Sequence, residues 1–313
     1  MMLFDESFLY KLERLSVMSR RSLSGQLQGE RRSLKRGQSV EFADFRPYSS
    51  GDDIRRIDWN AYARLERFFL KLFVEEEDLT VHILVDVTHS MDWGQPNKLE
   101  YAVRAAGALG YITLAGLDRL TITTLSNENI ENEKSGYFAP HRGKQSVSAL
   151  FGFLESYLPQ KTNKPIPHKT YSNLAPILQA YAHRAKSPGP LIIISDLFET
   201  PLDSNKNQIS MQQALNSLAA KGYEVTLLHI LSPDEVNPDL SGELKLLDCE
   251  SGAELEITAD FDLMEKYRRS LSEWRTDLRK FCAARGMHYV PVATDLPLEE
   301  LLFSWMRQHV VIR

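Results

Sequence analysis

Two short, mostly apolar runs that each end at an aspartate constrain the fold of this chain most strongly. Residues 81–85 read VHILV and are followed by Asp86, and residues 191–194 read LIII and are followed by Ser195 and Asp196. Runs of this kind are typical of strands that are buried on both faces of a parallel sheet. The carboxyl ends of such strands meet at one edge, where ligands bind. The sequence therefore predicts two carboxylates at the ligand-binding edge of an α/β fold.

Strand-like and helix-like segments alternate along most of the chain. The expected strands are residues 68–74, 81–85, 120–125, 191–194, 224–230 and 287–292, and the expected helices are residues 98–117, 147–158, 174–186, 211–220, 261–285 and 298–306. This alternation predicts a mostly parallel sheet with helices on both faces. Residues 243–258 break the pattern with two short alternating runs around a turn sequence, and they predict an inserted β-hairpin.

The first quarter of the chain differs from the rest, so we predict a boundary near residue 78. Residues 1–78 are expected to supply a helix, a basic arm and an arginine- and aspartate-rich segment packed on the core, and residues 79–313 the main domain. The segment 46–64 is predicted to form a buried lattice of ion pairs in which Trp59 is also packed, with a docking surface as the alternative. The members of this lattice would be Arg46, Asp52, Asp53, Arg55, Asp58 and Arg64.

Charge and composition exclude several classes of protein. The net charge is −5 and the sequence pI is about 6.0, which disfavours binding of a polyanion by the whole protein. The two cysteines, Cys249 and Cys282, have no CxxC spacing, so neither a disulfide framework nor a zinc site is expected. No leader-like or membrane-spanning segment is recognised, and the longest mostly apolar stretch is residues 105–117. These observations favour a cytoplasmic protein without an integral membrane segment.

The residues after the first aspartate have the spacing of a cation site. Asp86, Thr88 and Ser90 alternate with spacer residues, so a turning segment can point all three oxygen-bearing side chains the same way. Hard cations prefer such ligands. The competing interpretation is a helix cap, in which these side chains only satisfy turn amides. Asp196, at the end of a second buried strand, favours the cation site, whereas Lys98 and Glu100 are expected to face solvent on a helix.

Three motifs resemble those of the domain-of-unknown-function 58 family, whose core is a von Willebrand factor A-like domain. They are RPYSSGDDIRRIDWNAYAR at residues 46–64, VHILVDVTHSM at residues 81–91 and LIIISDLFE at residues 191–199. The hairpin and the segment GMHYVPVATD at residues 286–295 are similar as well. The resemblance covers nearly the whole chain after about residue 20. It implies a von Willebrand factor A-like, Rossmann-like sheet.

The resemblance also implies a ligand set and a partner. The metal ligands would be Asp86, Thr88, Ser90, Ser172 and Asp196, with Thr170 as a competing loop ligand. The implied cofactor is a divalent cation, Mg²⁺ in the first place, with Mn²⁺ or Ca²⁺ as alternatives. Two departures from the family pattern are that Thr88 replaces the usual serine and that the loop around Ser172 lacks the usual glycine pair. The implied partner is a MoxR-type AAA+ ATPase, in chaperone-like assembly or maturation.

The function predicted from these features is a non-enzymatic module that binds a partner protein through the cation. One alternative is a metal-dependent phosphohydrolase, but such enzymes usually carry a second aspartate where this chain has Thr88. A weaker alternative is nucleic-acid binding through the basic arm between Arg20 and Arg36, although no aromatic residues interleave with its charges. No phosphate-binding glycine motif is present.

Overall fold

A computed structural model gives the fold of two compact units. It describes residues 3–18, 40–49, 52, 54, 57–75, 79–126, 136–158, 174–184, 187–198, 209–247, 252–309 and 311–312. Unit 1 comprises Met1–Arg20 and Leu79–Arg313, and unit 2 comprises Arg21–Asp78. Unit 2 ends at Asp78, and the first helix belongs to unit 1.

A six-stranded sheet forms the centre of unit 1. Its strands are β3 (Thr80–Asp86), β4 (Arg119–Leu125), β5 (Tyr137–Arg142), β6 (Pro190–Ser195), β7 (Glu224–Leu231) and β10 (His288–Ala293). They lie in the order β10-β7-β6-β3-β4-β5, and every pair is parallel except β4 with the edge strand β5. The predicted α/β class with a mostly parallel sheet is confirmed. The chain continues from β3 to one side and reaches β6 on the other, so the crevice between β3 and β6 is a topological switch point.

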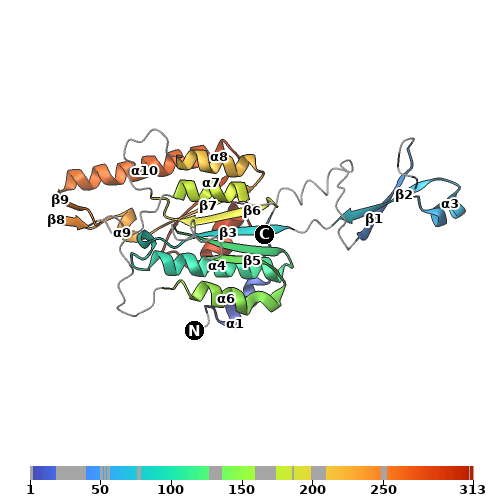
Figure 1. The fold of residues 1–313 in the computed structure, drawn as a ribbon, viewed down its shortest axis with the longest axis horizontal. Coiled ribbons are helices and arrows are strands. Elements are labelled where there is room, and N and C mark those ends of the chain that lie inside the picture. The colour runs from blue at the N-terminus through green and yellow to red at the C-terminus, as the bar shows by residue number, and fades with distance from the viewer. Residues whose placement is uncertain are drawn as a thin grey trace. The chain divides into compact units, whose positions relative to one another are not determined.

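Helices cover both faces of this sheet (Figure 1). On one face lie α1 (Glu6–Leu12), α4 (Lys98–Ala115) and α6 (Val147–Glu155), and on the other lie α7 (Leu174–Arg184), α8 (Met211–Ala220) and α10 (Phe261–Ala283). Alternate residues of β3 serve the two cores, since Val81, Ile83 and Val85 pack on the α4 side while Leu84 packs on the α7 side. A strand buried on both faces is mostly apolar, which explains the run at residues 81–85.

Helix α4 is the most extensively buried of the described helices of unit 1. Fifteen of its 18 residues are buried, and its sequence is rich in small residues that allow close approach. A Cβ at Gly110 would lie 2.9 Å from Cδ2 of Leu150 and 3.0 Å from Cδ2 of Leu120, so this glycine lets α6 and β4 pack against the helix. The Asn97 side chain accepts a hydrogen bond from the backbone N–H of Glu100 and caps the start of α4.

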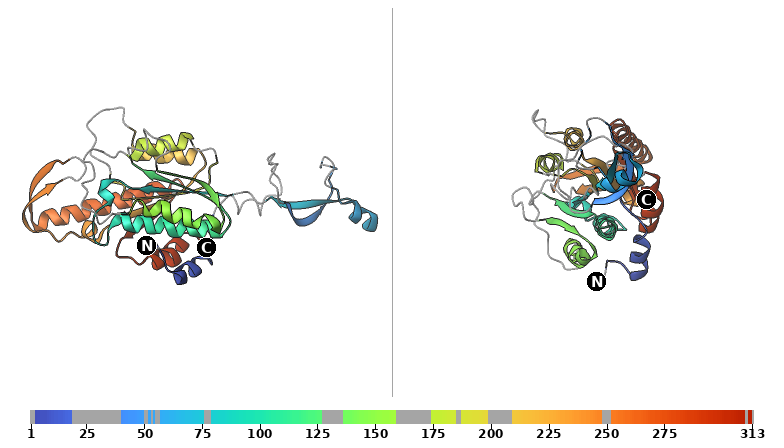
Figure 2. Two further views of the ribbon diagram at one scale, coloured as in Figure 1. Left: turned by 60° about the horizontal axis from the view of Figure 1, so that its bottom comes forward. Right: turned by 90° about the vertical axis from the view of Figure 1, so that its right-hand side faces the viewer.

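The C-terminal part of unit 1 returns to the first helix (Figure 2). The closing segment consists of α11 (Leu298–Glu300), a π-helical turn (Leu301–Trp305) and α12 (Met306–Gln308). Lys11 forms a 2.8 Å ion pair with Glu299, and Val17 makes an isolated antiparallel bridge with Ile312. The short elements of unit 1 are the 3-10 turns η2 (His89–Met91) and η3 (Lys144–Ser146) and the helix α9 (Pro233–Val236).

The predicted hairpin near residues 243–258 is confirmed. Strands β8 (Gly242–Leu247) and β9 (Glu254–Ala259) pair antiparallel and precede α10. Among the described residues, no helix of unit 1 or unit 2 combines the length and the apolar character needed to cross a membrane.

Unit 2 contains an antiparallel pair of strands and one short helix. Strands β1 (Val40–Pro47) and β2 (Phe69–Glu75) pair with one register shift, and α3 (Trp59–Leu65) lies between them in sequence. The strand expected at residues 68–74 is therefore present. Asp58 caps α3 by accepting hydrogen bonds from the N–H groups of Asn60 and Ala61.

Candidate metal centre

The two aspartates that follow the buried strands come together at the carboxyl edge of the sheet. Asp86 is the last residue of β3, and Asp196 follows β6, the parallel neighbour of β3. Both side chains are buried, with exposed fractions of 1% for Asp86 and 0% for Asp196. Thr88 is also buried, and Ser90 is half-buried at the start of the turn that leads to α4.

Both oxygens of the Asp86 carboxylate accept hydrogen bonds from the protein. The backbone N–H of Thr88 donates to Oδ1 over 3.0 Å, and the Ser195 hydroxyl donates to Oδ2 over 2.6 Å. The Ser195 hydroxyl in turn accepts from the N–H of Leu197 over 2.8 Å. Leu197 has a φ of 56°, a left-handed conformation that a leucine rarely adopts. The chain beyond β6 is thus bent back and fixed to the end of β3.

The hydroxyls of Thr88 and Ser90 form the part of the site best suited to a cation. Their oxygens lie 3.0 Å apart and share a hydrogen bond. Two ligands at about 2.1 Å on neighbouring positions of an octahedral ion are separated by about 3.0 Å. The pair therefore already has the spacing that Mg²⁺ requires of two adjacent ligands. These are neutral oxygen donors, so they would hold such an ion without cancelling its charge.

A lysine lies against the second aspartate, contrary to the expectation that Lys98 faces solvent. Its ammonium donates to Oδ2 of Asp196 over 2.7 Å and to Oε1 of Glu235 over 2.5 Å. The Lys98 side chain is only 1% exposed. It is the first residue of α4, and it points toward the loop after β6 and the short helix α9. The expectation failed because the carboxylate partners of Lys98 are remote in sequence.

Glu235 is held in place by its own backbone motif. The Ser232 hydroxyl caps α9, and the second carboxylate oxygen of Glu235 accepts from the N–H of Ser232 over 2.8 Å. This capping box leaves Oε1 for the ammonium of Lys98. The Tyr267 hydroxyl from α10 donates to the backbone carbonyl of Glu235 over 2.7 Å. Glu235 is therefore a fixed member of the site that the sequence analysis did not anticipate.

Burial and charge shift the pKa values of these groups. Burial raises the pKa of Asp86 to about 7, and the nearby charge of Asp196 adds to that effect. Burial by itself would lower the pKa of Lys98, but the charges of Asp196 and Glu235 outweigh it, so the pKa is raised and the ammonium stays charged. Burial also raises the pKa of Glu235, against the opposing charge of Lys98.

The structure describes only part of the predicted ligand set. Asp86, Thr88, Ser90 and Asp196 lie at the carboxyl ends of β3 and β6, whereas Ser172 and its competitor Thr170 lie outside the described residues. Within the described ranges, no group of three or more His, Cys, Asp or Glu side chains is arranged to hold a metal ion. A cation at this edge would therefore depend on the hydroxyls of Thr88 and Ser90.

One sequence signal could have identified Lys98. The N-terminal end of a helix carries a partial positive charge, so a lysine is unfavourable in the first turn. Lys98 occupies the first position of α4, directly after its capping residue Asn97. A positively charged side chain in that position, shortly after the strand-end motif, indicates carboxylate partners that are remote in sequence. Glu235 carried no comparable signal, because a capping-box glutamate is common at any helix start.

The arginine- and aspartate-rich segment of unit 2 does not match the predicted buried lattice in its described part. Arg46 and Asp52 form a 2.7 Å ion pair, but it is partly exposed, and Arg64 is exposed. Trp59 was expected to be packed, yet it is 62% exposed and meets Tyr62 and Phe68 edge to face. Asp53 and Arg55 lie outside the described residues. Asp58 is the one described member of the predicted lattice that is buried, at 8% exposure, whereas α3 beside it has no buried residue.

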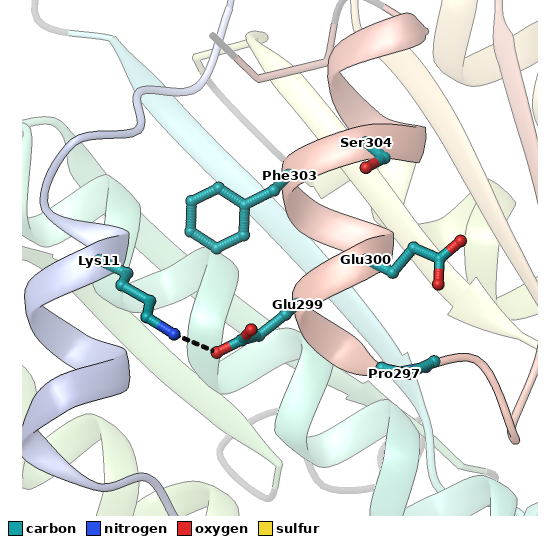
Figure 3. A pocket seen from close by; sticks show the side chains of 6 residues that line it. All are labelled: Lys11, Pro297, Glu299, Glu300, Phe303 and Ser304. Atoms are coloured by element: carbon teal, nitrogen blue, oxygen red, sulfur yellow. Dashed lines mark hydrogen bonds and ion pairs between the residues drawn. The ribbon is translucent and has the colours of Figure 1, made fainter.

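A shallow pocket of unit 1 lies apart from the predicted ligands. It has a volume of about 440 Å³ and is lined by Lys11, Pro297, Glu299, Glu300, Phe303 and Ser304 (Figure 3). The Lys11–Glu299 ion pair crosses one side of it. None of the residues predicted to hold a cation contributes to this lining.

A family comparison covers most of the chain. The sequence profile of a family described as "Protein of unknown function DUF58" matches residues 44–277. The chain belongs to the DUF58 family. This DUF58 protein is 27% identical to the uncharacterized protein Rv1480 of Mycobacterium tuberculosis over 295 residues, which are 93% of this chain and 86% of that protein. The uncharacterized protein Mb1516 of Mycobacterium bovis gives the same values.

Solved structures resemble this DUF58 protein only distantly. An aerotolerance-related membrane protein from Bacteroides fragilis has 15% identity and a TM-score of 0.38, and the match covers 74% of this chain and 99% of the other. The conserved hypothetical protein BatB from Bacteroides thetaiotaomicron has 17% identity and a TM-score of 0.38, with 74% and 98% covered.

Proposed function

We propose that this DUF58 protein is a non-enzymatic interaction module with a von Willebrand factor A-like core, which binds a partner through a divalent cation. The observation that carries the proposal is the 3.0 Å spacing of the Thr88 and Ser90 hydroxyls at the switch point beside Asp86. Thr88 and Ser90 would be direct ligands of the cation. Asp86 and Asp196 would hold its water molecules, and Ser172 or Thr170 would add the loop hydroxyl.

The cation would act as a Lewis acid and would offer a coordination position to a carboxylate of the partner. Mg²⁺ fits this role best, because it keeps several water molecules and accepts a mixture of hydroxyl and carboxylate oxygens. Mn²⁺ and Ca²⁺ are the alternatives. The protein's own residues fix Asp86 in advance, since Thr88 and Ser195 orient its carboxylate before any ion arrives. The family resemblance suggests a MoxR-type AAA+ ATPase as the partner.

The alternative of a phosphohydrolase receives less support from the same residues. A nucleophilic aspartate needs an oxygen directed at the substrate, but the Asp86 carboxylate is 1% exposed and both its oxygens accept hydrogen bonds. A phosphate-release assay would revive this alternative if turnover depended on Asp86. The basic arm that suggested nucleic-acid binding lies largely outside the described residues, so that alternative stays a prediction that a salt titration with DNA can test.

The proposed function is tested by measuring cation binding and partner capture together. Mn²⁺ binding is followed by the electron paramagnetic resonance signal of the free ion, and capture by pull-down of a purified MoxR-type ATPase with Mg²⁺ or with EDTA. Ser90→Ala should abolish both, because it removes one direct ligand without changing the charge. Ser217→Ala is the control, since that hydroxyl bonds only to its own helix. Mn²⁺ binding that is unchanged in Ser90→Ala would contradict the proposed site.

A further inference from the structure

The proposed function does not explain the position of the Lys98 ammonium. It is buried, and it is bonded at once to the candidate ligand Asp196 and to Glu235. The phenyl ring of Phe198 lies over it at 5.5 Å. The remaining Asp196 oxygen accepts from the N–H of Phe198 over 3.2 Å. Both oxygens of Asp196 are therefore directed at groups of the protein.

If Lys98 only linked α4 to the loop after β6, its side chain would not need to be charged. Burying an ion pair costs desolvation energy that its mutual attraction only roughly offsets, and apolar replacements are often as stable. The first position of a helix adds a further penalty for a lysine. A positive charge in this unfavourable position, on the carboxylate that would complete a cation site, indicates a role in that site.

The ammonium reduces the negative charge of the site. Lys98 offsets one carboxylate charge where it bonds to Asp196 and Glu235, so the site beside Thr88 and Ser90 is less negative than its carboxylates alone would make it. Without the ammonium the loaded site would be more negative by one charge and would attract the carboxylate of a partner less strongly. Lys98 thus makes the loaded site compatible with an acidic ligand.

We propose that Lys98 is a fixed counter-cation of Asp196. It keeps that carboxylate out of the direct ligands of the divalent ion, and it makes the loaded site accept a partner carboxylate. The inference rests on the proposed function for its second half only. The first half, that the ammonium and a metal ion compete for Asp196, can be tested by itself.

The experiment is a double-mutant cycle read by Mn²⁺ affinity. Lys98→Met with Glu235→Gln removes one positive and one negative charge together, so it frees Asp196 without changing the net charge. This double variant should bind Mn²⁺ about tenfold or more tightly than the natural chain. Asp196→Asn should remove that gain in the double variant, and it should lower the affinity by a clearly smaller factor in the natural chain. If Lys98 had only a structural role, the effect of Asp196→Asn on Mn²⁺ affinity would be the same in the natural chain and in the double variant.

Each other outcome has a definite meaning. Equal effects of Asp196→Asn in both backgrounds would overturn the role of Lys98 while leaving the proposed function in place. Binding by the double variant alone would support the counter-cation and overturn cation-mediated function. Absence of Mn²⁺ binding from every folded variant would overturn both. Circular dichroism checks the fold, and Lys98→Gln with Glu235→Gln is the second variant if the first does not fold.

Discussion

The ammonium of Lys98 lies 2.7 Å from Oδ2 of Asp196, and neither side chain is more than 1% exposed. This contact joins the first residue of α4 to the residue that follows β6. It therefore links the chain segments that follow β3 and β6 at the switch point.

Lys98→Met should lower the free energy of unfolding by about 3 kcal/mol. The substitution leaves Asp196 and Glu235 buried without their counter-ion, and breaking a buried pair from one side has costs of that order. Urea unfolding followed by tryptophan fluorescence measures the loss. The charge-balanced double variant Lys98→Met/Glu235→Gln should lose less than the single variant. A single variant as stable as the natural chain would mean that the carboxylates find other partners.

Ser195→Ala should cost about 2 kcal/mol of stability. The hydroxyl donates to Asp86 over 2.6 Å and accepts from Leu197 over 2.8 Å, and its removal leaves buried polar groups unsatisfied. Ser146→Ala is the matched control, because that hydroxyl makes only a long 3.5 Å bond to the Arg142 carbonyl. Equal losses in the two variants would show that the bond to Asp86 contributes nothing specific.

Two glycine substitutions should have opposite effects. Gly110→Ala places a methyl group 2.9 Å from Cδ2 of Leu150, and overpacking of this kind costs about 1–3 kcal/mol. Gly152→Ala, in the exposed part of α6, meets nothing within 4 Å and should stabilise the helix by about 1 kcal/mol. Thermal unfolding of the two variants measures the difference. A gain in stability for Gly110→Ala would contradict the close contact of α4 and α6.

His82 should make the protein less stable as the pH falls below about 6.5. Burial lowers the pKa of His82 from its usual 6.5, and the ring bonds to the Tyr181 hydroxyl over 2.6 Å and to the Ser187 carbonyl over 2.9 Å. The folded state therefore favours the neutral ring. Its contribution is complete above the unfolded pKa and is lost as the pH falls toward the folded one. Urea unfolding at pH 7.5 and 5.5 should show a larger loss for the natural chain than for His82→Gln. Equal losses would assign the pH dependence to other groups.

The sheet was predictable because its signal is local. Residues 81–85, 191–194 and 224–230 are mostly apolar, since each strand is covered on both faces by helices, and they appear as β3, β6 and β7. The hairpin β8–β9 was predictable for the same reason, because its alternation and its turn lie within one short segment. The edge strand β5 was not expected, since its sequence YFAPHR has one covered face and contains a proline.

Only the part of the candidate site that lies in residues 86–90 was predictable. Asp86, Thr88 and Ser90 follow one strand, so their spacing is visible in the sequence. The contacts of Lys98 with Asp196 and Glu235 join positions separated by 98 and 137 residues, and no periodicity reports them. The exposure of Trp59 was missed for a different reason. An aromatic residue among charges was assumed to be packed, whereas α3 has no buried residue.

The bridge between Val17 and Ile312 has a consequence for biosynthesis. Helix α1 leaves the ribosome before its neighbours α4 and the closing helical segment, which are made much later. Until then Phe4, Leu12 and Leu15, which are buried in the finished unit, have no core to enter. A nascent chain halted in between would therefore display an apolar segment, which is the kind of surface that chaperones bind.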